Sequence, residues 1–393
     1  MRTDDSVAVD WAKERERFPA FAERNYLASA CMGPVPKDAL ADIGAYARSR
    51  VRGNRSLEEW LGMLDEMTGL IAALLEVPTT TVAIRDSATA CHAAFMASVA
   101  PRGERNRVVV SALDFHSSLQ LYAAQRLRGF EVIVVPPTPD GSETDIDAVL
   151  RAVDERTALV SLTLVSRYGG LTDVSRVAAR ALEVGALSLV DVYPAIGVLP
   201  IRASNLSADA VVGGVHKWLS GSTGCAFLHV RDDLADRLEP AYPGWFGHAS
   251  LDRFVKTKAF EDEWSPRPGA RRFQQGSPCI PSLYSSRAGV RTVLELGPDR
   301  MAARSRVLLA RIEAALAREG LSAVVPAARS VGALTVRVAD PERVVHLLEE
   351  RGIDVDQRRN EVVRVSPHPC STEDECDAFV AALAEIVRKG PSS

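Results

Sequence analysis

A lysine and an aspartate stand where buried strands are expected to end. Lys217 follows an apolar run that closes with two glycines, and a turn rich in glycine and hydroxyl residues separates it from a second apolar run, residues 225–230. Asp191 comes directly after the apolar run 186–190. A buried ammonium or carboxylate is costly unless it is paired or used in chemistry. Both residues are therefore candidates for a reactive site.

The two side chains match the anchors that pyridoxal phosphate (PLP) requires. A lysine amine forms a Schiff base with the PLP aldehyde, and a carboxylate can hold the protonated pyridine nitrogen. The alternative is that Lys217 lies on the surface and Asp191 caps a helix. The agreement of other segments with a PLP site, set out below, favours the first interpretation.

Length and composition exclude several classes of protein. A chain of 393 residues favours two domains, and 47% hydrophobic with 25% charged residues is typical of a globular protein in water. A net charge of -4 gives no electrostatic case for nucleic acid or a membrane surface. No apolar run reaches the ~18 residues of a membrane span, and residues 1–18 lack the apolar core of a signal peptide. The 6 cysteines show neither metal-ligand nor paired spacing, which predicts no metal site and a cytoplasmic location.

Short apolar runs alternate with helical patterns through the first two thirds of the chain. The runs are 82–84, 108–110, 132–135, 159–164, 187–190, 210–212 and 226–230. Such a pattern predicts an α/β fold, with a mostly parallel seven-stranded sheet covered on both faces. A long helical pattern, 286–319, and a small α+β pattern follow. We predict an N-terminal arm (1–25), a large PLP-binding domain (26–265), and a linking helix with a small C-terminal domain (266–393).

Two strand-to-helix turns of this sheet carry candidate ligand-binding residues. Ligands bind at the carboxyl ends of such strands, and helix N-termini favour phosphate. Ala88 and Thr89 stand in the first turn and could cradle a phosphate, although an ordinary helix cap is the alternative. Phe115 and His116 stand in the next turn, where an aromatic ring could stack on a flat cofactor.

Taken together, these segments resemble the class V, fold-type I PLP enzymes: cysteine desulfurases, selenocysteine lyase, kynureninase and their relatives. The resemblance covers about residues 25–388. It implies the fold-type I architecture, with Lys217 as the Schiff-base lysine and Asp191 on the pyridine nitrogen. It further implies that Ala88 and Thr89 bind the phosphate and that Phe115 or His116 stacks on the ring.

The resemblance also implies a homodimer with shared active sites. Residues 244–248, GWFGH, are similar to a kynureninase segment whose tryptophan, here Trp245, reaches the phosphate across the dimer interface. Residues 272–278, RFQQGSP, resemble a segment whose hydroxyl residue, here Ser277, serves the neighbouring subunit's phosphate.

Two further residues take their roles from the resemblance. Arg364 matches the arginine that binds the substrate α-carboxylate, a task that suits a bidentate guanidinium. His216 occupies the place of a phosphate-binding histidine of desulfurases, where kynureninases tend to carry tyrosine.

Three departures bear on the reaction. Pro194 replaces a residue that bonds the cofactor's phenolic oxygen, and Arg167 replaces an asparagine beside the ring. Arg167 could supply the missing donor, read a second acidic group on the substrate, or lie on the surface. Residues 352–363 contain no cysteine, whereas desulfurases carry their nucleophile there; Cys370 and Cys376 are expected to be packing thiols.

The favoured hypothesis is a PLP-dependent C–S (β) lyase that acts on a cysteine S-conjugate, with bacterial specialised metabolism as a further hypothesis. It preserves desulfurase-like chemistry and needs no protein thiol. The alternatives are kynureninase-type C–C hydrolysis, and chemistry at Cα such as transamination, epimerisation or decarboxylation-coupled deamination. A catalytically silent binding or regulatory subunit with this fold is the alternative from another class; the intact Lys217 and Asp191 argue against it.

Overall fold

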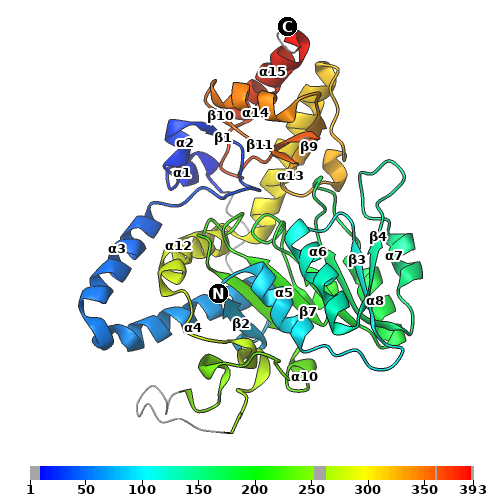
Figure 1. Ribbon diagram of the computed structural model, residues 1–393. Coiled ribbons are helices and arrows are strands. Elements are labelled where there is room, and N and C mark those ends of the chain that lie inside the picture. Colours follow the sequence, from blue (N-terminus) through cyan, green and yellow to red (C-terminus); the bar gives the residue numbers. More distant parts are fainter. Residues whose placement is uncertain (1–8, 252–262, 359–360, 391–393) are drawn as a thin grey trace.

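The computed structural model describes residues 9–251, 263–358 and 361–390. The seven apolar runs form one sheet with the strand order β2-β8-β7-β6-β5-β3-β4 (Figure 1). Strand β8 pairs antiparallel with both β2 and β7, and the other pairings are parallel. The predicted α/β fold with a mostly parallel seven-stranded sheet is therefore confirmed. The strands are β2 Val82–Arg85, β3 Arg107–Ser111, β4 Glu131–Val135, β5 Thr157–Thr163, β6 Leu187–Asp191, β7 Ala210–Gly214 and β8 Ala226–Val230.

Helices bury both faces of this sheet. On β3, Val109 packs into one hydrophobic core, and Val108 and Val110 pack into another on the opposite face. This alternation follows from the twofold repeat of a strand and explains why the strands read as continuous apolar runs. The first core includes α4 Leu57–Leu75, α8 Val174–Val184 and α12 Ile280–Leu296, with α7 Ile146–Ala152 beside them; the second includes α5 Ala88–Ala97 and α6 His116–Ala123.

The parallel strands all deliver their carboxyl ends to one edge of the sheet. Strand β6 ends at Asp191, and the chain reaches Lys217 three residues after β7. Strand β3 leads to the turn before α6, and β2 leads to the first turn of α5. Because β6 and β7 are hydrogen-bonded neighbours, residues that are far apart in sequence meet at this edge.

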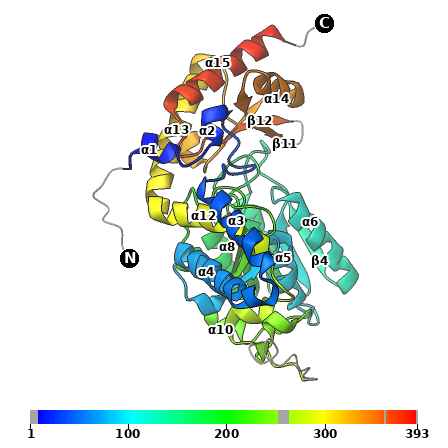
Figure 2. The ribbon, with the colours of Figure 1, turned by 90° about the vertical axis from the view of Figure 1, so that its left-hand side faces the viewer.

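The C-terminal part has its own antiparallel sheet, in the order β11-β12-β9, and its own core. The strands β9 Leu334–Arg337, β11 Asp356–Arg358 and β12 Val362–Val365 pack with α13 Pro298–Arg318, α14 Pro341–Glu349 and α15 Glu373–Lys389. The N-terminal helices α1 Trp11–Arg15 and α2 Ala20–Glu23 lie against this part (Figures 1 and 2), where the Arg15 guanidinium pairs with Glu375 at 2.6 Å. Strand β1 Asn25–Tyr26 pairs parallel with β10 Ile353–Asp354.

The helical pattern predicted over 286–319 is two helices in the structure. Helix α12 ends at Gly297, whose φ of 84° is left-handed, and α13 begins at Pro298. A proline has no backbone N–H to continue a helix, so the pair Gly297-Pro298 divides the segment. Helix α12 packs against α3 Asp38–Val51 and α4, whereas α13 packs against α15 (Figure 2). The domain limits proposed from the sequence stay a prediction.

Two further helices of the described residues are short: α9 Ala203–Leu206 and α10 Asp232–Ala235. Across the described ranges, no helix combines the length and the apolar character that crossing a membrane requires.

Candidate active site

Lys217 lies beside two aromatic rings at the sheet edge. Its Nζ is 4.7 Å from the ring centroid of Tyr193 and 5.9 Å from that of Phe115. Its pKa is lowered from the usual 10.5 to about 8, first by burial and then by the Arg364 guanidinium, while the Asp191 carboxylate opposes the change. An amine with this pKa is partly unprotonated near neutral pH, as a nucleophile or general base requires.

The N-terminal segment around Gly33 packs against the turn that carries Lys217. The Gly33 N–H donates to the His216 carbonyl at 2.8 Å. A Cβ added at Gly33 would lie 1.9 Å from the Lys217 carbonyl oxygen, so any larger residue there would displace the turn. The same segment reaches the C-terminal sheet, because Ala28 forms a β-bridge with Ser366. The segment around Gly33 therefore links the lysine turn to the strand that carries Arg364.

Asp191 is buried, with 7% of its surface exposed, at the carboxyl end of β6. Its Oδ1 accepts a hydrogen bond from the Tyr193 N–H at 2.8 Å, and its Oδ2 lies 3.4 Å from His92 Nε2. The sequence interpretation assigned no role to His92. The available signal was its position four residues after Ala88, which places both residues on one side of α5.

The predicted phosphate turn is the start of α5. Helix α5 begins at Ala88, and the Ser87 side chain caps it by accepting from the Ala90 N–H at 3.1 Å. The Thr89 hydroxyl is 2.7 Å from that of Ser117 in the first turn of α6. The N-termini of α5 and α6 therefore lie together, and their free backbone N–H groups and hydroxyls form a setting that suits an anion.

Phe115 caps the start of α6 and exposes 54% of its surface, which is unusual for a phenylalanine. Its ring tilts against that of His116, with 4.2 Å between the centroids. Arg167 fixes the preceding turn, because its Nη2 donates to the carbonyls of Ala112 at 2.8 Å and Asp114 at 3.0 Å. Of the two candidate stacking rings, Phe115 is the one whose contact with the lysine amine is established.

The Asp114 carboxylate is buried in the same turn. It accepts from the backbone N–H groups of Ser111 at 3.1 Å and Thr163 at 2.9 Å. Burial nevertheless raises its pKa to about 7, and the two hydrogen bonds only partly oppose this effect. Asp114 therefore joins the ends of strands β3 and β5 at the site.

Tyr193 and His216 form a hydrogen-bonded pair next to the lysine, through the Tyr193 hydroxyl and His216 Nδ1. Burial, with the Lys217 charge second, lowers the pKa of His216 to about 4. Burial also raises the pKa of Tyr193, so its hydroxyl stays protonated. Tyr193 was not recognised as a site residue from the sequence, although it stands two residues after Asp191, just past the end of strand β6, which pairs with β7. Pro194 offers only its carbonyl, which accepts from Trp218 Nε1 at 2.9 Å.

Arg364, the candidate carboxylate binder, already holds a carboxylate. It is 7% exposed on β12, and Asp356 of the neighbouring β11 accepts from its Nε at 2.8 Å and from its Nη2. Asp356 also accepts from Arg358 at 3.1 Å. The sequence interpretation overlooked Asp356 and Arg358. Their signal would have been the hairpin register, which places Asp356 opposite Arg364.

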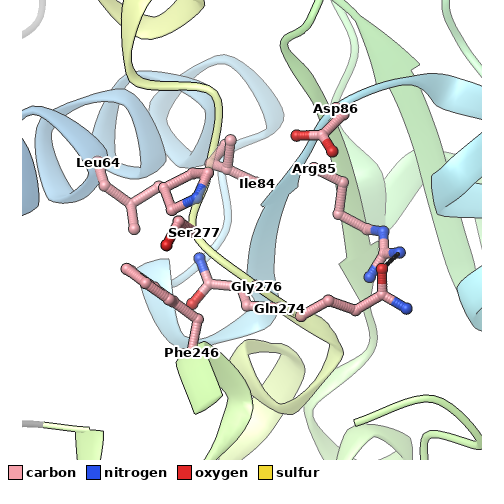
Figure 3. A pocket seen from close by; sticks show the side chains of 10 residues that line it. Leu64, Ile84, Arg85, Asp86, Phe246, Gln274, Gly276 and Ser277 are labelled. Carbon is pink, nitrogen blue, oxygen red and sulfur yellow. Dashed lines mark hydrogen bonds between the residues drawn. The ribbon is translucent and has the colours of Figure 1, made fainter. Parts of the chain in front are cut away.

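Ser277, and Phe246 next to Trp245, lie at the end of strand β2, close to the turn that begins α5. Trp245 packs edge-on against Phe246, with 4.5 Å between ring centroids. Ser277 lines a cavity of about 120 Å³ together with Asp86 and Phe246 (Figure 3). Lys217 does not line this cavity. The roles of Trp245 and Ser277 in a neighbouring subunit's site stay predictions.

Among the residues that the structure describes, no three histidine, cysteine, aspartate or glutamate side chains are grouped as metal ligands.

Comparison with known proteins identifies the family. The aminotransferase class-V family matches residues 25–378. A kynureninase of Deinococcus radiodurans is 27% identical over 394 residues, covering 96% of this chain and 93% of that protein. An uncharacterised aminotransferase of Bacillus subtilis, YcbU, is 25% identical, covering 94% and 96%.

Solved structures share the fold at lower identity. The apo cysteine desulfurase of Thermococcus onnurineus superposes with a TM-score of 0.85 at 19% identity, covering 98% of this chain and 99% of that one. The cystine C–S lyase C-DES, solved with its product cysteine persulfide, superposes with a TM-score of 0.82 at 19% identity, covering 94% and 99%. The match over residues 25–378 shows that this chain belongs to the aminotransferase class-V family of PLP enzymes.

Proposed function

We propose that this protein is a PLP-dependent lyase that breaks a bond to the Cβ of an amino acid, with C–S cleavage of a cysteine S-conjugate as the first candidate reaction. The observation that carries the proposal is Lys217, an amine with a pKa of about 8 that lies near both a buried carboxylate and a buried guanidinium. Enzymes of this family use PLP, and the donor set of this chain suits that cofactor.

The aldehyde carbon, the ring nitrogen, the phosphate and the ring face of PLP each have a candidate group at the sheet edge. Lys217 would bond the aldehyde carbon, and Asp191 would pair with the ring nitrogen. The α5 start with Thr89, and His216, would hold the phosphate, and the exposed ring of Phe115 would stack on the pyridine. When bound, the cofactor supplies an electron sink that makes the Cα proton of an amino acid acidic.

The protein's own groups then account for elimination. Arg364 binds the substrate α-carboxylate in place of Asp356, through the same bidentate geometry. Lys217 would take the Cα proton, and its pKa of about 8 would allow it to return a proton later. A thiolate leaves Cβ with its bonding electrons. This route needs no thiol of the protein, in agreement with the absence of cysteine from residues 352–363.

A second candidate is kynureninase-type hydrolysis between Cβ and Cγ. The Tyr193 hydroxyl, paired with His216 beside Lys217, supplies a phenol next to the lysine, although kynureninases tend to carry the tyrosine at position 216 itself. The segment 244–248 and the 27% identity to the Deinococcus kynureninase point in the same direction. Transamination, epimerisation and decarboxylation-coupled deamination use the same anchors and form a third outcome.

The test is a substrate panel on the purified, PLP-loaded protein: S-alkyl cysteines, cystine, selenocysteine and kynurenine. Pyruvate with a thiol or persulfide supports C–S lysis, whereas anthranilate with alanine assigns the hydrolase. A change in the visible spectrum without a β-cleavage product would assign the reaction to Cα. Lys217→Ala should lose the visible absorbance of lysine-bound cofactor, and Lys37→Ala, at an exposed lysine, is the control. A protein that binds no PLP would instead favour the silent binding subunit.

We also propose a homodimer in which Trp245 and Ser277 complete the partner's phosphate site. Mixing Lys217→Ala chains with Trp245→Ala chains tests it. A hybrid dimer would contain one site with both an intact lysine and an intact tryptophan. Recovered activity on mixing supports a shared site, and two variants that stay inactive together contradict it.

A further inference from the structure

Three buried polar side chains form a hydrogen-bonded series that begins at Asp191. His92 Nε2 lies 3.4 Å from Asp191 Oδ2, and His92 Nδ1 lies 2.9 Å from the Tyr122 hydroxyl. The Ser161 side chain in turn hydrogen-bonds that hydroxyl. His92 and Tyr122 are each 1% exposed and Ser161 is 2% exposed, so water does not reach these side chains. Helix α5, helix α6 and strand β5 supply one member each.

The surroundings of this series are apolar. Tyr122 packs in the core that covers one face of the sheet, with Leu159 and Leu189 from the neighbouring strands. Buried polar groups weaken such a core unless every one is hydrogen-bonded, and apolar replacements of similar shape are often neutral or stabilising. Packing alone therefore does not explain a histidine at position 92. Its contact with the charged group Asp191 does suggest a reason.

The hydrogen bonds can all point toward that carboxylate. Ser161 donates to the Tyr122 oxygen, Tyr122 donates to Nδ1 of His92, and the proton on Nε2 of His92 then faces Oδ2 of Asp191. Burial raises the pKa of Tyr122, so the phenol keeps its proton. With the Tyr193 N–H on Oδ1, Asp191 has a donor at each oxygen. Donors at both oxygens favour the ionised carboxylate.

We propose that His92, with its tautomer fixed by Tyr122 and Ser161, is a positioning residue that keeps Asp191 ionised and aimed at the ring nitrogen of the cofactor. This inference rests on the proposed PLP site. An ionised Asp191 leaves the shared proton on the ring nitrogen, where it draws electrons from the reacting carbon. Without the histidine donor, Asp191 becomes a stronger base and is free to turn.

The test uses the holoenzyme loaded with PLP that carries ¹⁵N in its ring. The ¹⁵N chemical shift reports directly whether the ring nitrogen is protonated, and it does not depend on turnover. His92→Phe keeps a ring of similar shape and removes both nitrogens. Tyr122→Phe removes only the hydroxyl and leaves His92 free to place its proton on Nδ1. We expect the ¹⁵N signal to move toward the unprotonated value in both variants, and further in His92→Phe.

Two matched variants control for the loss of a buried polar group elsewhere. His229→Phe removes a buried histidine that bonds Thr81, and Tyr284→Phe removes a buried hydroxyl that bonds Glu59. Both should keep the wild-type ¹⁵N signal and kcat. In His92→Phe we expect kcat to fall about tenfold or more, by analogy with supporting groups around metal ligands.

An unchanged ¹⁵N signal in His92→Phe with cofactor bound overturns the inference and leaves the PLP assignment standing. If that variant does not fold, Tyr122→Phe decides by the same signal. A wild-type protein that takes up no PLP overturns both the inference and the proposed function.

Discussion

Two buried ionic groups near Lys217 are held in opposite ways. The Asp191 carboxylate accepts a hydrogen bond from the Tyr193 N–H at one oxygen and faces the His92 ring at the other. The Arg364 guanidinium is bound bidentately by the carboxylate of Asp356. Arg364 therefore has a charged partner within the protein, whereas no arginine or lysine is among these contacts of Asp191. If the proposed function holds, Asp191 would bind a cationic ring that stays in the protein, and Arg364 would bind an anion that exchanges.

The strands that carry these groups also differ in how firmly they are held. Asp191 ends a central strand with hydrogen-bonded neighbours on both sides, β5 and β7. Arg364 lies on β12 of the C-terminal sheet, and its partner Asp356 is on the edge strand β11. A carboxylate on a short edge strand can move aside with less disturbance than one within the large sheet. Exchange of Asp356 for a substrate carboxylate is thus compatible with the fold.

The largest effect should follow Asp191→Asn. The amide removes the negative charge while it keeps the shape, so the ring nitrogen loses its counter-charge. Since removing one partner of a buried pair typically costs 3–5 kcal/mol, we expect kcat to fall by at least about 100-fold. Steady-state kinetics with the best substrate of the panel measure the change. Asp209→Asn, at a buried aspartate that bonds Ser188 away from the site, is the control. A kcat within twofold of wild type would remove Asp191 from the cofactor site.

Arg364→Ala should act on substrate binding instead. Two charge-assisted hydrogen bonds to the substrate are lost, each of about 1.5–3 kcal/mol. The end of the competition with Asp356 offsets about 1 kcal/mol of this loss, so we expect KM to rise roughly 30-fold, with PLP affinity little changed. Arg364→Lys keeps the positive charge but loses the bidentate guanidinium, so its KM should lie between those of the wild type and Arg364→Ala. Arg337→Ala on the adjacent strand β9 serves as the control, because the Arg337 side chain is exposed. Loss of PLP affinity with KM unchanged would contradict the assignment.

Asp356→Asn is the sharpest test of the contrast, because it removes the competitor of the substrate carboxylate. We expect KM to fall about fivefold, which corresponds to about 1 kcal/mol of competition. The unfolding free energy should fall as well, since Arg364 and Arg358 lose their shared partner. Kinetics and urea unfolding measure the two effects. Asp377→Asn, at an exposed pair with Arg311, is the control. A raised KM would show that Asp356 orients Arg364 for the substrate.

The sequence revealed the parts of this site that break a local pattern. Lys217 and Asp191 stand out because a charge follows an apolar strand, and the strands themselves stand out as uninterrupted apolar runs. The pair Gly297-Pro298 was an equally visible signal, and an apolar repeat that continues across it concealed the helix break.

The partners of the charged groups are set by register and packing, which leave no local pattern. His92 is 99 residues from Asp191 and 30 from Tyr122, and a histidine on a helix suggests no particular partner. Asp356 opposes Arg364 only through the register of one hairpin. Arg167 shows the same limit, since its contacts with Ala112 and Asp114 depend on how two loops meet.

The last effect concerns the stability of the apoprotein, and it tests whether the positive charge of Arg364 affects Lys217. Burial and the Arg364 charge lower the pKa of Lys217 from 10.5 to about 8. Below pH 8 the amine is charged in both the folded and the unfolded chain, so burying this charge lowers the unfolding free energy by its full amount. Between pH 8 and 10.5 the unfolded chain binds more protons than the folded one, so stability should rise with pH and the cost should vanish above that range.

Urea unfolding of the apoprotein against Lys217→Met isolates this contribution, because the other titrating groups are common to both. The difference in unfolding free energy, Lys217→Met minus wild type, should be largest below pH 8 and should shrink toward pH 10.5. In the Asp356→Asn background the Arg364 charge is no longer balanced by a carboxylate, so the pKa of Lys217 should fall further. The difference in unfolding free energy should then begin to decrease at a lower pH. A difference that stays flat from pH 7 to 10 would show that the amine is not desolvated, and Lys217 would then lack the lowered pKa on which its role as a base depends.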